Sequence, residues 1–186
     1  MHKAVERAAE LLIACFQKGG SLLLCGNGGS AADCAHIAGE LCKGFLLPRR
    51  PEQAFMDAVG EPWAGRLQQG LRAIDLTANT ALITAIINDI GGEDIFAQQV
   101  MAFGRPGDIL LGISTSGNAE NVRRAMLAAR ARGLATIAMT GTGGGRLAQV
   151  CDLLVESAQR ETRSVQEEQI GQYHNLCMLI EQALFR

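Results

Sequence analysis

The sequence predicts an α/β protein, a three-layer αβα sandwich with a five-stranded, mostly parallel sheet and a long C-terminal helix. Two observations predict this class. Short apolar runs without polar alternation, which suit strands buried on both faces, occupy 21–25, 108–113, 135–140 and 152–156. A fifth candidate strand spans 73–77, and helical patterns lie between the strands. This alternation is typical of a doubly wound sheet with helices on both faces.

The helices can be placed in order along the chain. An opening helix carries Val5, Ala8, Leu12 and Phe16 on one face, and a second helix begins near Ala31. A third is predicted over 118–132, with Asn118 as its cap and Gly133 closing it. The last, over 164–185, has an apolar stripe of Val165, Tyr173, Leu176, Cys177, Ile180 and Leu184.

Length and composition favour a single domain over residues 1–186. The chain is 48% hydrophobic and 19% charged, enough to bury a substantial core. A net charge of −2 argues against direct binding to nucleic acid. Charged residues interrupt the N-terminal segment, and no apolar run approaches the roughly 20 residues of a membrane span. We therefore expect no membrane association and a cytoplasmic location.

The six cysteines form no CxxC pair and lie in apolar segments. Their spacing excludes a zinc knuckle, and buried thiols in a reducing compartment are the expected state. The connection over 46–72 is the least regular part of the chain. Trp63, Leu67 and Leu71 are spaced four apart there, which predicts a short helix.

A glycine-rich loop follows the first predicted strand. In the stretch "GNGGS", the backbone N–H groups of Asn27, Gly28 and Gly29 can form an anion nest, with Ser30 adding a hydroxyl at the helix N-terminus. The stretch matches neither the Walker loop nor the dinucleotide fingerprint. Taken alone, it is compatible with a phosphate site or with an ordinary strand-to-helix turn.

A second loop strengthens the phosphate interpretation. Ser114, Thr115 and Ser116 also lie between a buried strand and a helix. Their hydroxyls can bind a phosphomonoester, although such hydroxyls often only cap a turn. Because strand-end loops of a parallel sheet meet at one edge, the two loops together favour a phosphorylated ligand.

Two pairs of polar residues are candidates for the reacting end of the site. His36 and Glu40 are four apart and share one helix face, so they can meet one metal ion or substrate, or form an exposed pair. Gln166 and His174 are eight apart, about 12 Å along a straight helix, so converging on one small ligand needs long side chains or an irregular helix.

Further polar residues allow two interpretations. Asn88 and Asp89 precede a glycine break, where an Asx-turn or a sugar contact would explain them. Glu167, Glu168 and Gln169 are predicted to be solvated or to face an interface.

These motifs together resemble the sugar isomerase (SIS) family, most specifically its heptose isomerases. The resemblance covers nearly the whole chain and includes "CGNGGSAADCAHIAGEL", "NDIGGEDIF", "GRPGDILLGISTSGNAENV", "MTGTGGG" and "VQEEQIGQYH". It implies the SIS fold and the conversion of a ketose phosphate to an aldose phosphate through an enediol. It favours sedoheptulose 7-phosphate as the substrate and D-glycero-D-manno-heptose 7-phosphate as the product.

The resemblance also implies roles for individual residues. Asn27, Gly28, Gly29 and Ser30 match the first substrate loop, Ser114, Thr115 and Ser116 the phosphate loop, and Asn88 and Asp89 sugar-contacting positions. His36, Glu40, Gln166 and His174 match the ligands of one zinc ion, and Gln166 also matches a substrate contact. Glu40 matches the general base and His174 the general acid, and whether Glu40 is chiefly ligand or base stays open. Homotetramers with active sites at subunit boundaries are implied as well.

Departures from the family pattern keep two alternatives open. Ala119 occupies a position that is commonly a phosphate-binding serine, and the 46–72 connection is longer than typical. The chain could therefore be an SIS isomerase of another phosphosugar. It could also be a non-catalytic SIS protein, either a sugar-phosphate sensor or an adaptor that binds the replication initiator. The carboxylate of Glu40, which those adaptors tend to lack, favours the enzyme.

Overall fold

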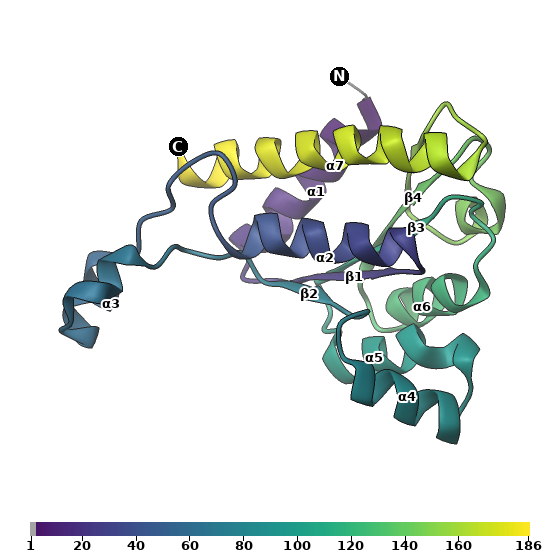
Figure 1. The fold of residues 1–186 in the computed structure, drawn as a ribbon, viewed down its shortest axis with the longest axis horizontal. Coiled ribbons are helices and arrows are strands. Elements are labelled where there is room, and N and C mark those ends of the chain that lie inside the picture. Colours follow the sequence, from purple (N-terminus) through teal and green to yellow (C-terminus); the bar gives the residue numbers. More distant parts are fainter. Residues whose placement is uncertain (1–2) are drawn as a thin grey trace.

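The computed structural model describes residues 3–186 and arranges five strands in one sheet of order β2-β1-β3-β4-β5 (Figure 1). The strands are β1 (Leu22–Gly26), β2 (Ala73–Asp75), β3 (Ile109–Ser114), β4 (Ala135–Thr140) and β5 (Leu153–Glu156). Every neighbouring pair is parallel, with Leu23 of β1 in register with Leu110 of β3. The predicted fold class is confirmed, and all five predicted strands form within a residue or two of their expected ends.

Seven α-helices form in the described residues. They are α1 (Lys3–Gln17), α2 (Gly29–Cys42), α3 (Gln53–Val59), α4 (Thr80–Asp89), α5 (Ile95–Phe103), α6 (Glu120–Ala131) and α7 (Thr162–Phe185), with short 3-10 turns at η1 (Pro62–Arg66), η2 (Gly92–Asp94) and η3 (Gly145–Gln149). Helices α1, α2 and α7 cover one face, and α5 and α6 cover the other (Figure 1).

Alternate residues of each central strand supply the two cores. Leu22 and Leu24 of β1 pack beneath α1, α2 and α7, whereas Leu23 and Cys25 pack beneath α5 and α6. Because both faces are buried, each strand needs apolar side chains in both directions. This explains why the strands appear in the sequence as unalternated apolar runs.

Several local predictions differ from the structure. Helix α6 forms where predicted, but Asn118 does not cap it: its amide donates to the carbonyl of Ser116, and Ala119 takes the cap position. The position predicted for a helix from Trp63, Leu67 and Leu71 is wrong. The α-helix of this segment lies earlier, at 53–59, and Trp63 belongs to the 3-10 turn η1. Helices α4 and α5 were not predicted.

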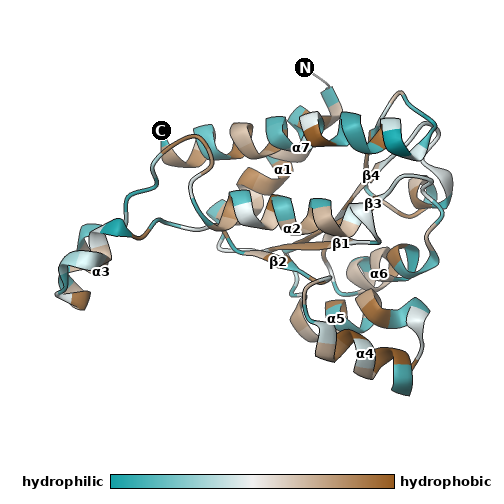
Figure 2. Cartoon of the chain, viewed as in Figure 1, coloured by the Kyte–Doolittle hydropathy of each residue, from teal (hydrophilic) through white to brown (hydrophobic). Residues whose placement is uncertain are grey.

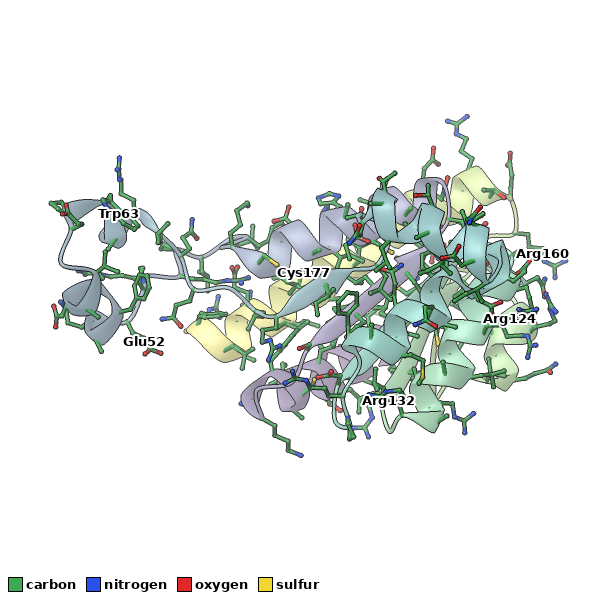
Figure 3. The ribbon with its side chains drawn as sticks, turned by 90° about the horizontal axis from the view of Figure 1, so that it is seen from below. Glu52, Trp63, Arg124, Arg132, Arg160 and Cys177 are labelled. Atoms are coloured by element: carbon green, nitrogen blue, oxygen red, sulfur yellow. The ribbon has the colours of Figure 1, made fainter. Side chains whose placement is uncertain are left out.

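The 46–72 connection forms an arm that projects from the body of the molecule (Figures 1 and 3). No residue of α3 is buried, and Phe55, Trp63 and Leu67 are exposed. The arm also holds a hollow of about 300 Å³ lined by Pro51, Glu52, Phe55, Leu67, Gln68 and Gln69. The arm therefore has little core of its own.

Two predictions about environment can be compared with the described residues. Within residues 3–186 no helix has both the length and the apolar character needed to cross a membrane. All six cysteines are free, and Cys15, Cys25, Cys34 and Cys177 are buried as expected, whereas Cys42 is exposed.

Candidate active site

The loop after β1 is shaped by two glycines. Gly28 adopts φ +56°, a conformation that favours glycine, and its carbonyl accepts the N–H of Ala31 as α2 begins. Gly29 lies directly against the side-chain amide of Gln166 from α7, so that a Cβ at Gly29 would collide with it. Ser30 is buried in the first turn of α2. The helix therefore starts two residues before the predicted Ala31.

The loop after β3 is held by its own hydrogen bonds. The Thr115 carbonyl accepts the N–H of Gly141, and the Ser116 hydroxyl accepts the N–H of Asn118 at 3.2 Å. Ser114 is buried at the end of the strand. The Ser116 hydroxyl thus caps the turn, which the sequence left open as an alternative to phosphate binding.

The two loops lie side by side at a topological switch point. Strands β1 and β3 are neighbours, but α2 leads to one face of the sheet and α6 to the other. Two reciprocal amide hydrogen bonds of 2.9 Å join Asn27 of the first loop to Asn121 in the first turn of α6. Ligands of open α/β sheets bind at such a point, beyond the carboxyl ends of the strands. Asn121 is a residue that the sequence reasoning missed.

A cluster of polar side chains lies farther along α2, where α7 packs beside it. His36 Nε2 lies 3.3 Å from Glu40 Oε1 and 3.4 Å from His174 Nε2. The side chain of His36 is 43% exposed and that of Glu40 is 18% exposed. Phe45 packs against the His174 ring with 5.5 Å between ring centroids. The structure therefore brings the predicted base and the predicted acid to the same imidazole.

Two buried residues beneath His36 were also missed from the sequence. The Tyr173 hydroxyl lies 3.0 Å from His36 Nδ1 and donates to Asp33 Oδ1 at 3.3 Å. Burial raises the pKa of the Asp33 carboxyl, while the Tyr173 hydrogen bond and His36 act in the opposite direction. Burial, followed by the charge of Asp33, raises the pKa of Tyr173. The spacing of Asp33 three residues before His36 was the available signal.

Gln166 lies apart from this cluster. Its amide rests on Gly29, at the start of α2, whereas His174 is two turns farther along α7. Gln166 therefore lies beside the first loop, while its roles as a substrate contact and as a metal ligand both stay predictions.

The donor types near His36 suit a zinc ion, which binds imidazole nitrogen and carboxylate oxygen. In a tetrahedral site with bonds of about 2.0–2.1 Å, ligand atoms stand about 3.3–3.4 Å apart. The distances from His36 Nε2 to Glu40 and to His174 match that spacing. Across residues 3–186, however, no three His, Cys, Asp or Glu side chains are jointly placed to hold a metal.

Asn88 and Asp89 are not brought to the cluster. They end α4, which packs against α5, and the Asn88 amide donates to Asp89 Oδ1 at 2.7 Å. Both are exposed and lie in a helix rather than in the Asx-turn considered from the sequence. Their sugar-contacting role stays a prediction.

The expectation that residues 167–169 are solvated or face an interface is wrong for Gln169. Gln169 is fully buried, and neither polar atom of its side chain has a partner within the described residues. Glu168 accepts the hydroxyl of Ser157, and Glu167 is exposed as expected. The third position faces inward because it lies four residues after the buried Val165 on the same face of α7.

Comparison with known proteins gives one family and close relatives. The family model described as SIS domain matches residues 1–69 and 52–141. A phosphoheptose isomerase from Rhodospirillum rubrum is 42% identical over 181 residues, which make up 97% of this chain and 86% of that protein.

Two solved structures agree with this match. A phosphoheptose isomerase from Neisseria gonorrhoeae aligns with a TM-score of 0.81 at 37% identity, and one from Francisella tularensis with a TM-score of 0.83 at 33% identity. Each alignment covers 97% of this chain and 86% of the other. Since each alignment covers almost the whole chain, the similarity in fold extends over most of the described residues.

Proposed function

Because this chain belongs to the SIS domain family, we propose that it interconverts sedoheptulose 7-phosphate and D-glycero-D-manno-heptose 7-phosphate, with Glu40 as base and His174 as acid. The general activity, aldose–ketose isomerisation of a phosphorylated sugar, is shared with relatives at about 40% identity over almost the whole chain. The predicted family and the predicted class of enzyme are thereby confirmed.

The observation that carries the proposal is the distance between the loops and the polar cluster. From Gly29 to His36, α2 rises about 10 Å, at about 1.5 Å per residue. An extended seven-carbon sugar phosphate spans on the order of 10 Å from phosphorus to its carbonyl end, given C–C bonds of about 1.5 Å. A phosphate at the loops would therefore place the reacting carbons of a heptose beside His36 and Glu40.

The phosphate is proposed to bind at the switch point. The N-terminus of α2 contributes the positive end of the helix dipole, with the Ser30 hydroxyl in its first turn. Ser114, Thr115 and Ser116 add hydroxyls from the adjacent loop, and the Asn27–Asn121 bonds hold the first loop against the helix that follows the second. Neutral donors of this kind suit a phosphomonoester.

The proton transfer then uses the cluster. Glu40 removes a proton from the carbon that bears the hydroxyl, and His174 donates a proton to the neighbouring carbonyl oxygen, which gives the enediol. Return of the proton to the adjacent carbon, with loss of a hydroxyl proton to His174, completes the aldose. His36, Glu40, Gln166 and His174 would hold the zinc ion, which when bound supplies Lewis-acid polarisation of a sugar oxygen.

Assembly and location belong to the same proposal. Exposed apolar side chains lie on α4, directly after it and on α5, at Ile87, Ile90, Met101 and Phe103, and α4 shows this apolar character in Figure 2. Apolar surface of this kind is typical of subunit contacts, which supports a homotetramer. Six free cysteines support a reducing, cytoplasmic location.

The test measures turnover of a panel of ketose phosphates of five, six and seven carbons, with and without added zinc. We expect the seven-carbon substrate to give the highest kcat/KM. We expect Glu40→Gln to lower kcat about 10²–10⁴-fold, the usual contribution of a general base. Glu10→Gln, on the exposed face of α1, is the matched control and should leave kcat unchanged.

Turnover that survives Glu40→Gln would refute the assignment of the base. A wild-type protein that turns over none of the panel would instead favour the non-catalytic alternative.

A further inference from the structure

His36 is an exposed side chain attached to a buried hydrogen-bonded chain. Tyr173 is 1% exposed, and its hydroxyl bridges His36 Nδ1 on one side and the buried carboxylate of Asp33 on the other, at 3.0 and 3.3 Å. Asp33 and His36 both come from α2, and Tyr173 comes from α7. The contact therefore links the two helices directly beneath the reactive cluster.

With Asp33 ionised and both contacts hydrogen-bonded, the number of hydrogens fixes the direction of this chain. A phenol has one hydrogen to donate, and an ionised carboxylate can only accept. With the Tyr173 hydrogen directed to Asp33, the phenol oxygen is left to accept, so that Nδ1 of His36 is the donor. In a neutral imidazole only one nitrogen carries a hydrogen, which leaves a lone pair on Nε2.

We propose that Tyr173 and Asp33 are positioning residues that hold His36 as its Nδ1–H tautomer, with the Nε2 lone pair presented to Glu40 and His174. The inference rests on the proposed function only in its consequence for zinc. A ring nitrogen that donates to a carboxylate or another fixed acceptor is a common way to orient a metal-binding histidine.

The surrounding rings support a fixed orientation of His36. Its ring meets Tyr173 edge-on, with centroids 5.3 Å apart and planes at 72°, and meets His174 at 5.0 Å and 79°. A flip of the His36 ring would break the bond to the phenol and move Nε2 away from Glu40 and His174. The buried pair thus restrains a side chain that its own exposure would leave free to rotate.

The tautomer of His36 determines whether its Nε2 atom carries a lone pair or a hydrogen toward the site. With its lone pair outward, His36 Nε2 adds a third electron-pair donor next to the Glu40 carboxylate and His174. Without Tyr173, the other tautomer is favoured, because Nε2–H can donate to Glu40 Oε1 at 3.3 Å. Tyr173 therefore decides whether His36 presents a donor or an acceptor to the site.

The experiment compares the wild-type protein with Tyr173→Phe by two measurements that do not depend on turnover. The first is the side-chain ¹⁵N spectrum of the histidines at pH 8, without metal or sugar, with His36 assigned by comparison with His36→Gln. We expect the Nδ1–H tautomer in the wild type and the Nε2–H tautomer in Tyr173→Phe. The second is competition for zinc alone, in which Tyr173→Phe should bind about 10- to 100-fold more weakly.

A matched control separates positioning from loss of a buried hydroxyl. Thr136 is fully buried in β4 and donates to the carboxylate of Asp152 at 2.8 Å, so Thr136→Val removes a similar bond elsewhere. It should alter neither the His36 spectrum nor zinc affinity. An Nε2–H tautomer in the wild type, or an unchanged spectrum and zinc affinity in Tyr173→Phe, would overturn the proposal. Loss of isomerase activity on all sugars with these results intact would overturn only the proposed function.

Discussion

A buried ion pair at the root of the arm gives the sharpest stability prediction. Arg49 Nε donates to Glu181 Oε1 at 2.9 Å, and both side chains are fully buried. Glu181 also accepts the backbone N–H groups of residues 45, 46 and 47. Arg49 donates in addition to the carbonyls of Leu41 and Glu40, in the last turn of α2. The pair therefore joins α7, the arm and the end of the helix that carries Glu40.

Arg49→Met keeps the aliphatic volume and removes the guanidinium. The Glu181 carboxylate would stay buried without its cationic partner, and two carbonyls at the end of α2 would lose a donor. Breaking a buried pair from one side costs about 3–5 kcal/mol, and each unsatisfied buried polar group about 1–3 kcal/mol. Because part of this loss can relax into solvent at the arm, we expect the free energy of unfolding to fall by about 3–5 kcal/mol.

The assay is urea unfolding at one fixed protein concentration, since assembly would otherwise shift the apparent stability. In thermal unfolding, the same loss of stability should lower Tm by about 6–20 °C for a chain of this length. Arg50→Met is the matched control, because the Arg50 side chain is exposed, and it should change stability by less than about 0.5 kcal/mol. A loss below about 1 kcal/mol for Arg49→Met would refute the reasoning.

The same pair predicts a dependence on pH. Burial alone would raise the pKa of the Glu181 carboxyl, but the backbone N–H groups and Arg49 together lower it below its usual 4.5. A lowered pKa in the folded state adds stability above the unfolded value, which is lost as the pH falls through the folded value. Wild-type stability should therefore decline as the pH falls below about 4.5, and Arg49→Met should show a shallower decline.

Two further pairs of variants test the site and the core. Gly29→Ala should raise KM for the phosphosugar about tenfold or more, because the new Cβ displaces the Gln166 amide. Gly39→Ala, in open space on the same helix, should leave KM unchanged and stabilise the fold by about 0.5–1 kcal/mol. Gln169→Met should raise the free energy of unfolding by about 1–3 kcal/mol, because it removes two unpartnered buried polar atoms. Gln99→Met, which loses bonds to the carbonyls of Leu76 and Ile95, should lower it, and equal signs in urea unfolding would contradict this account.

The strands were predictable from the sequence because burial on both faces leaves a direct trace. An unalternated run such as residues 21–25 admits few other structures in a short segment. Helix α4 was missed because its burial leaves no such trace. Only Ile86 of its apolar run is buried in the structure, so the run shows neither the one-sided stripe of an amphipathic helix nor the pattern of a strand buried on both faces. The short helix of the arm was misplaced because spacing alone assigned Leu67 and Leu71 to it. In the structure, Pro62 starts a 3-10 turn that ends at Arg66.

The site was predictable where its residues are close in the sequence. His36 and Glu40 are one turn apart, so their shared face follows from the helix period alone. Tyr173 and Asp33 are 140 residues apart and meet only because α7 packs beside α2. Gln169 was assigned to the surface because its neighbours are charged, but burial in a helix changes from one residue to the next.

The pairing of α2 with α7 explains how one fold positions all parts of the site. The two helices run in the same direction, since Gln166 meets Gly29, Tyr173 and His174 meet His36, and Glu181 meets the segment after α2. These contacts fall in order from the phosphate loop, through the reactive cluster, to the Arg49 pair at the root of the arm. A sliding or tilting of α7 would therefore disturb the phosphate site and the proton-transfer site together. It follows that the buried Glu181, although it contacts neither site, holds α7 in the register on which the distance between phosphate and base depends.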